Sequence, residues 1–288
     1  MVSYQSDAHD DLKRILDAGR LSGKDKIPVV AMVAHLNRAI IFKLPVNGII
    51  FPGEAGRGGT HIDSIGRYDA KVRLPYSEVI LEFANEPTGG EARGSAFTKV
   101  VCIASDMNGV GAIQDYVKLR LGESASEYAI AITGAFYSPE HRMWMPNGFT
   151  LMMKDDGMTK VFSNFSYTEE VSKDDAYNDV YGETSSVVML MCALSCSNVS
   201  IEKVAAPDAV NKKRIKCGKK PIRDHHILVL GSKSQGERSL GGTHASPRVH
   251  LRRGHIRRLE QKNIWVNACV VGNKKLGTVT KDYMVKQR

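Results

Sequence analysis

The chain has 288 residues, of which 42% are hydrophobic and 25% are charged. These proportions are those of a globular protein with a real core, and they exclude long disordered tracts. The five cysteines are odd in number and widely scattered. This pattern argues against a disulfide-stabilised secreted scaffold and favours a reducing cytoplasm.

Charge is unevenly distributed along the chain. Residues 203–288 contain 21 Lys and Arg against 5 Asp and Glu, a net charge of +16, whereas residues 1–202 carry −7. A basic end attached to an acidic body indicates a polyanionic partner, most often nucleic acid. The alternative is that the basic end docks on the acidic body of the same chain.

Neither export nor a membrane role is expected. Polar residues follow Met1, without the order of charged, apolar and small residues that a secretory signal requires. The longest apolar run, from Val187 to Leu194, is much shorter than a membrane span.

The first half of the chain predicts two helices and then a sheet. Apolar residues at helical spacing predict helices over residues 7–16 and 29–42. The glycine-rich residues 51–68 are expected to form a loop. Four short runs rich in β-formers then predict an antiparallel, meander-like sheet, with strands at residues 78–83, 99–104, 128–132 and 161–165.

The second half predicts a buried helix, a basic helix and a β-rich end. Residues 185–196 form an apolar run without Gly or Pro, which predicts a helix packed on the sheet. Pro207 and Gly218 flank a basic helix over residues 208–217, and a strand follows at 226–230. Residues 231–242 are small, polar and glycine-rich, which is typical of a flexible joint.

Three further strands are expected, over residues 249–259, 264–271 and 278–285, with turns at 260–263 and 272–275. Because three short strands rarely fold alone, we expect them to form a small SH3-like barrel or to extend the main sheet. The predicted class is therefore α+β, with a mainly antiparallel sheet and a few packed helices. Residues 1–230 would form the α+β body and residues 243–288 the basic, β-rich C-terminal module.

The segment from Arg248 to Arg258 has the most distinctive chemistry in the chain. It holds five arginines and two histidines, and His244 lies just upstream. Arginine presents a planar fork of donors that matches phosphate, so this density predicts binding to a nucleic-acid backbone. Charge that merely discourages aggregation of an edge strand is the alternative. The predicted nucleic-acid-binding residues are Arg248, Arg252, Arg253, Arg257 and Arg258, with Lys212, Lys213 and Arg214 of the basic helix.

Catalysis is a further step from the same residues. A metal-free ribonuclease needs a base for the 2′-hydroxyl, an acid for the leaving oxygen and cations for the developing charge. His244, His250 and His255 are the candidates for the first two roles, and the arginines for the third. No acidic cluster for two-metal chemistry lies near them, so no metal or cofactor is expected. Histidines that serve only as hydrogen-bonding groups are the simpler alternative.

Other motifs predict structure rather than chemistry. Cys192 and Cys196 lie four residues apart, but their apolar surroundings indicate buried thiols rather than a zinc site. His225 and His226 are neighbours on a predicted strand, so they point in opposite directions and do not favour a shared metal. Residues 53–61 lack the Gly-Lys-Ser/Thr ending of a P-loop.

The last third of the chain resembles a group of hypothetical proteins encoded by tailed bacteriophages and prophages. The similarity covers roughly residues 205–285 and rests on two stretches: Asn211-Lys212-Lys213-Arg214 with Gly218-Lys219-Lys220-Pro221, and His244-Ala245-Ser246-Pro247-Arg248 through Trp265-Val266, Val271-Gly272 and Lys281-Asp282-Tyr283. Leu74-Pro75-Tyr76 is shared as well. The resemblance implies a phage protein acting in the bacterial cytoplasm, and it carries over no catalytic role.

Together these features predict a phage-encoded cytoplasmic protein that binds RNA or DNA through its C-terminal Arg/His-rich strand. A metal-independent ribonuclease is the enzymatic version of this hypothesis. The alternative is a host-takeover or counter-defence protein whose basic module binds an acidic bacterial protein. The sequence leaves open which of these applies, whether the protein is an enzyme, and its oligomeric state.

Overall fold

A computed structural model describes residues 4–19, 21, 23–50, 73–85, 99–230, 248–252, 255–266, 269–271 and 273–278. For residues 248–252, 255, 258, 269–271 and 273–278 it describes only the backbone. The helices are α1 (Tyr4–Asp17), α2 (Lys26–Arg38), α4 (Ala112–Leu121), α5 (Lys173–Asp179), α6 (Tyr181–Leu194) and α7 (Asp208–Lys216). The strands of the body are β1 (Ile40–Lys43), β2 (Glu78–Phe83), β3 (Val100–Asp106), β4 (Ile130–Ser138), β5 (Met143–Pro146), β6 (Phe149–Met153), β7 (Thr159–Ser163), β8 (Val199–Val204) and β9 (His225–Leu230).

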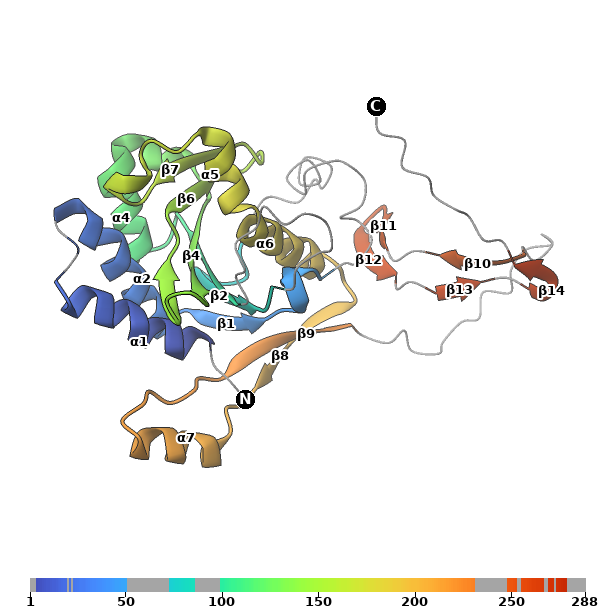
Figure 1. Ribbon diagram of the computed structural model, residues 1–288. Helices are drawn as coiled ribbons and strands as arrows, with labels where there is room; N and C mark the ends of the chain where they lie inside the picture. The colour runs from blue at the N-terminus through green and yellow to red at the C-terminus, as the bar shows by residue number, and fades with distance from the viewer. Residues whose placement is uncertain are drawn as a thin grey trace.

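These nine strands form one sheet with helices on both faces (Figure 1). The strand order is β7-β6-β4-β3-β2-β1-β9-β8, and β5 pairs with β4. Strand β1 runs parallel to β2 and β9, and the other pairs are antiparallel. The predicted α+β class with a mainly antiparallel sheet is therefore confirmed.

The two faces of the sheet carry separate hydrophobic cores. Helices α1, α2 and α4 cover one face, where Leu12, Met32 and Ile103 are fully buried. Helices α5 and α6 cover the other face, where Phe42 and Leu190 are fully buried. Because most of the sheet lies between helices, its central strands β2 and β3 are buried on both faces and consist largely of apolar residues.

The predicted helix over residues 29–42 is wrong in its last turn. Helix α2 ends at Arg38, and residues 40–43 form β1. Arg223 of the β9 approach donates to the backbone oxygens of Leu36, Arg38 and Ala39, so it caps the helix where the chain turns into the sheet. The error arose because Ile41 and Phe42 are both buried, and an apolar run buried on both faces of a sheet also fits a helical pattern.

A split in the sheet is filled by buried polar side chains. Strand β4 pairs with β6 through its first half and with β5 through its second. At the junction, Asn164 donates to the oxygen of Asn147 at 2.8 Å and accepts from Tyr116 at 2.9 Å. Asn147 in turn donates to Glu183 of α6 at 3.2 Å. These bonds satisfy groups that the split would otherwise leave unpaired, and they link the helical layers through the sheet.

The C-terminal strands differ from the prediction in their bounds. They are β10 (Arg248–Arg252), β11 (His255–Leu259), β12 (Lys262–Val266), β13 (Cys269–Val271) and β14 (Asn273–Thr278). The strand predicted over 249–259 is thus two strands, as is the one predicted over 264–271. Residues 273–275, predicted as a turn, belong to β14, and the predicted strand at 278–285 lies almost wholly outside the described residues.

The pairing of these strands forms a three-stranded sheet, β13-β10-β14, and a separate β11–β12 hairpin. The hairpin contacts the body beside α6, where Trp265 packs with Ala193 and Cys196. Asn198 fixes this contact by donating to the backbone oxygen of Trp265 and accepting from its nitrogen, at 2.9 and 2.8 Å. The joint predicted at residues 231–242 lies outside the described residues. In the described part of the chain, no helix has both the length and the apolar character needed to cross a bilayer.

Candidate functional site

The structure distributes the predicted phosphate-binding residues over two regions. Arg248, His250 and Arg252 belong to β10, and His255, Arg257 and Arg258 belong to β11. Among these, the side chain of Arg257 is described, and it is exposed. His244 and Arg253 lie outside the described residues. The other three, Lys212, Lys213 and Arg214, lie on α7.

Helix α7 projects from the body on the arm formed by β8 and β9 (Figure 1). None of its residues is buried, and Lys212, Lys213 and Lys216 are exposed. No acidic side chain of the described chain forms an ion pair with these three lysines. The helix therefore presents three available ammonium groups to solvent.

Arg214 has a different role from its two lysine neighbours. Its side chain is only 15% exposed and contacts Asp7 of α1 at 3.3 Å and the Ser6 hydroxyl at 3.0 Å. Its Nε also donates to the backbone oxygen of Lys220 at 2.7 Å. Arg214 thus joins the end of α7 to α1. The contact with Asp7 is of the kind expected if the basic end of the chain docks on its acidic body.

Lys220, in the loop that follows α7, makes a second contact with the body. Its Nζ donates to Nε2 of His9 at 2.9 Å and to Oδ1 of Asn37 at 2.8 Å. Since Nε2 accepts, the proton of the neutral imidazole lies on Nδ1, which faces Asp10 at 3.2 Å. Burial and then the Lys220 ammonium lower the pKa of His9, despite the opposing effect of its hydrogen bond to Asp10.

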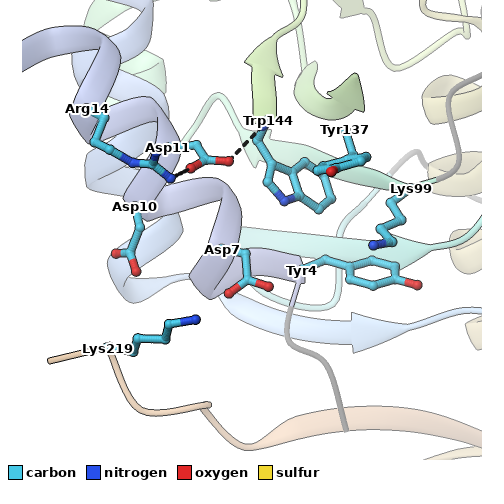
Figure 2. Close-up of a pocket in the computed structure, with 9 residues that line it drawn as sticks. All are labelled: Tyr4, Asp7, Asp10, Asp11, Arg14, Lys99, Tyr137, Trp144 and Lys219. Carbon is cyan, nitrogen blue, oxygen red and sulfur yellow. Dashed lines mark hydrogen bonds and ion pairs between the residues drawn. The ribbon is translucent and has the colours of Figure 1, made fainter. Parts of the chain in front are cut away.

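A polar pocket of about 270 Å³ opens beside α1 (Figure 2). Helix α1 contributes three aspartates, Arg14 and, at its first residue, Tyr4, and the other aromatic lining residues are Tyr137 and Trp144. The Lys99 ammonium lies 4.8 Å from the ring centre of Tyr137 and 5.7 Å from that of Tyr4. The lining residues are Tyr4, Asp7, Asp10, Asp11, Arg14, Lys99, Tyr137, Trp144 and Lys219.

One end of the pocket lies where β2 ends, because Lys99 precedes Val100 of β3, which pairs with Phe83. Lys43 closes β1 and pairs in register with Glu82 near the end of β2. The backbone N–H of Gln5, in the first turn of α1, donates to the buried Glu82 carboxylate at 2.6 Å. Burial raises the pKa of that carboxyl.

A second polar cluster has the composition of a catalytic triad without its geometry. Buried His35 lies between Ser105 and Glu78, but its Nδ1 faces both, at 3.2 and 3.5 Å, while Nε2 faces the backbone oxygen of Val79. A triad needs the acid and the nucleophile on different ring nitrogens. Burial alone would raise the pKa of Glu78, but hydrogen bonds from His35 and Arg38 outweigh it and hold that pKa at about 2. We assign this cluster to stability.

The pocket residues escaped the sequence analysis because they are far apart in the chain. Tyr4, Lys99, Trp144 and Lys219 come from four separate segments, and no local spacing connects them. The only sequence signal is the run of Asp7, Asp10 and Asp11 on one predicted helix. Within the described ranges, no group of three or more His, Cys, Asp or Glu side chains is arranged to hold a metal ion.

Comparisons with protein-family models, with curated proteins and with solved structures found no match for this chain.

Proposed function

We propose that this protein binds nucleic acid through two basic regions, the lysines of α7 and the arginines of β10 and β11. The observation that carries the proposal is the state of Lys212, Lys213 and Lys216, which are exposed and have no acidic partner in the described chain. Arg257 is exposed as well. Lysine and arginine side chains that neutralise phosphates release the condensed counterions of nucleic acid, which favours binding.

The charge of the surrounding chain supports the same proposal. Residues 203–288 carry a net charge of +16. Some of these groups have internal partners: Arg214 and Lys220 contact α1, and Lys203 pairs with Asp224 at 2.7 Å. Among the side chains of this region that the structure describes, those that are exposed and form no ion pair with a described residue include Lys212, Lys213, Lys216, Lys219, Arg257 and Lys262.

The finer proposals depend on this one. A metal-independent ribonuclease would use His244, His250 and His255 as base and acid, with the neighbouring arginines stabilising the developing charge. The C-terminal strands would complete a small SH3-like module over residues 243–288. The resemblance to phage and prophage proteins supports a role in the cytoplasm of an infected bacterium.

The experiment that identifies the partner is affinity recovery of the full-length protein from expressing bacteria, with and without nuclease treatment. We expect RNA or DNA to co-purify from the untreated lysate and to disappear after treatment. A variant with Arg252, Arg253, Arg257 and Arg258 changed to Ala should recover much less nucleic acid, because phosphate contacts supply most of non-specific affinity.

The same recovery tests the alternative of an acidic bacterial protein as partner. If one acidic protein remains bound in equal amount after nuclease treatment and the untreated sample contains no nucleic acid, the nucleic-acid proposal is wrong. Salt dependence alone does not separate the two partners, because both contacts are electrostatic.

A further inference from the structure

The polar pocket beside α1 holds opposite charges that do not pair with each other. On the helix wall, Asp10 contacts His9 within the described chain. The imidazole of His9 is neutral in this arrangement, because its Nε2 accepts a hydrogen bond from Lys220. On the opposite wall, Lys99 lies over two tyrosine rings and forms no ion pair with a described carboxylate. Among the described residues, a carboxylate without a cationic partner and an ammonium without a carboxylate partner therefore line the same space.

Asp7 and Asp11 are less available than Asp10. Asp7 contacts Arg214, and Asp11 binds both Arg14 and the backbone N–H of Trp144, the latter at 2.8 Å. These contacts hold the helix wall in place and leave Asp10 as the aspartate of this wall whose partner, among the described residues, is a neutral group rather than an arginine. Lys219 also lines the pocket, but it is exposed on the loop that follows α7.

The indole N–H of Trp144 faces the pocket from the aromatic wall (Figure 2). Trp144 is only 2% exposed, yet among the described residues its indole N–H has no hydrogen-bond acceptor. Figure 2 shows the indole nitrogen on the side of the ring that faces the pocket, between Asp7 and Lys99. An indole N–H that faces a pocket and has no acceptor among the described residues can donate to a ligand there.

We propose that this pocket binds a small zwitterion of the basic amino-acid class. The ligand carboxylate would accept from the Trp144 indole and pair with Lys99, and its ammonium or guanidinium group would bind Asp10. The tyrosine rings would contact the aliphatic part of the ligand. A simple anion provides no cation for Asp10, and a simple amine provides no acceptor for Lys99 and Trp144, whereas a ligand with both charges can bind all three.

The test uses the full-length protein with three matched probes: L-arginine, agmatine, which lacks the carboxylate, and L-citrulline, which lacks the guanidinium charge. Binding is measured by calorimetry and by the indole N–H signals in a ¹H–¹⁵N spectrum. The chain has two tryptophans, and Trp265→Phe assigns the Trp144 signal. We expect L-arginine to bind and to shift the Trp144 signal, and both analogues to bind about 10- to 100-fold more weakly, because each lacks one charge-assisted hydrogen bond.

Two variants locate the site. Lys99→Met and Asp10→Asn should each weaken L-arginine binding about 10- to 100-fold. Lys118→Met and Asp174→Asn, exposed positions on α4 and α5, serve as controls and should leave it unchanged. Melting curves establish that every variant is folded. The proposal is wrong if L-arginine neither binds nor shifts the Trp144 signal, if agmatine binds as well as L-arginine, or if binding survives both pocket variants.

Discussion

Lys220 donates a hydrogen bond from Nζ to Nε2 of His9 over 2.9 Å, an arrangement that only an unprotonated Nε2 can accept. The pKa of His9 is lowered from 6.5, chiefly by burial, so the unfolded chain binds a proton more readily than the folded one. This contribution to stability is complete above pH 6.5 and is lost as the pH falls below it.

We therefore predict that acid destabilises the contact between α1 and the loop after α7. His9→Gln keeps an acceptor for Lys220 but cannot take up a proton, so it should lose less stability than the parent between pH 7.5 and pH 5.5. Urea unfolding at the two pH values measures the difference. His141→Gln, at an exposed histidine, is the control. Parallel losses in the parent and His9→Gln would contradict the prediction.

Glu183 should have the opposite pH dependence. Burial raises the pKa of its carboxyl from 4.5 to about 7, and the nearby Asp179 adds to the effect. The folded state therefore holds the proton more tightly, and this stabilisation, present below pH 4.5, is lost as the pH rises through 7. Glu183→Gln should stabilise the protein at pH 8 by up to about 3 kcal/mol and have little effect at pH 4. Glu170→Gln, at an exposed site, is the control in urea unfolding.

The buried helix α6 gives a test of packing. Leu190 is fully buried on the face of the sheet that α6 covers, so Leu190→Ala should destabilise by roughly 2–5 kcal/mol. Leu119→Ala, at a leucine that is 67% exposed on α4, should change stability by less than about 0.5 kcal/mol. Equal melting temperatures for the two variants would overturn the placement of α6.

Helices and strands could be predicted from the sequence where the spacing of apolar residues and the flanking residues within one segment identify the element. The apolar run of α6 and the flanking Pro207 and Gly218 of α7 predicted both helices correctly. Strand β1 was mistaken for helix because its burial depends on parallel neighbours distant in the sequence. Helix α4 was not predicted from the sequence. The pocket lined by Lys99 and Asp10 was not predicted either, because only the folded arrangement of distant segments brings these residues together.

The sequence alone also could not show which basic residues contact the body of the protein and which are exposed. Lys212, Lys213 and Arg214 are consecutive, yet only Arg214 reaches Asp7. Such a contact depends on which way a side chain points from its helix and on which element packs beside it, and the sequence alone does not show the second. We predict that Arg214→Gln speeds amide hydrogen exchange in α7, because it removes contacts to Ser6 and Asp7, whereas Lys212→Gln does not. Equal exchange in the two variants would show that Arg214 does not hold the arm.

The ribonuclease proposal predicts a specific product. Cleavage of RNA should persist in EDTA and leave a 2′,3′-cyclic phosphate, because the internal hydroxyl is the nucleophile that a histidine base activates. His250→Ala or His255→Ala should reduce the rate by roughly 10²- to 10⁴-fold without abolishing binding, with a bell-shaped pH profile near neutrality in the parent. Intact RNA after incubation with the purified protein would leave binding as the function.

The salt dependence of nucleic-acid affinity tests the central proposal most directly. Lys212, Lys213 and Lys216 changed together to Gln are compared with Lys118, Lys160 and Lys173 changed together to Gln, which removes the same charge from exposed positions of the body. Each phosphate contact contributes about 0.9 to the slope of log affinity against log salt for duplex DNA. We predict that the α7 variant lowers the slope by roughly one to three units and that the body variant leaves it unchanged. Equal slopes for the two variants would show that α7 does not contact the phosphates.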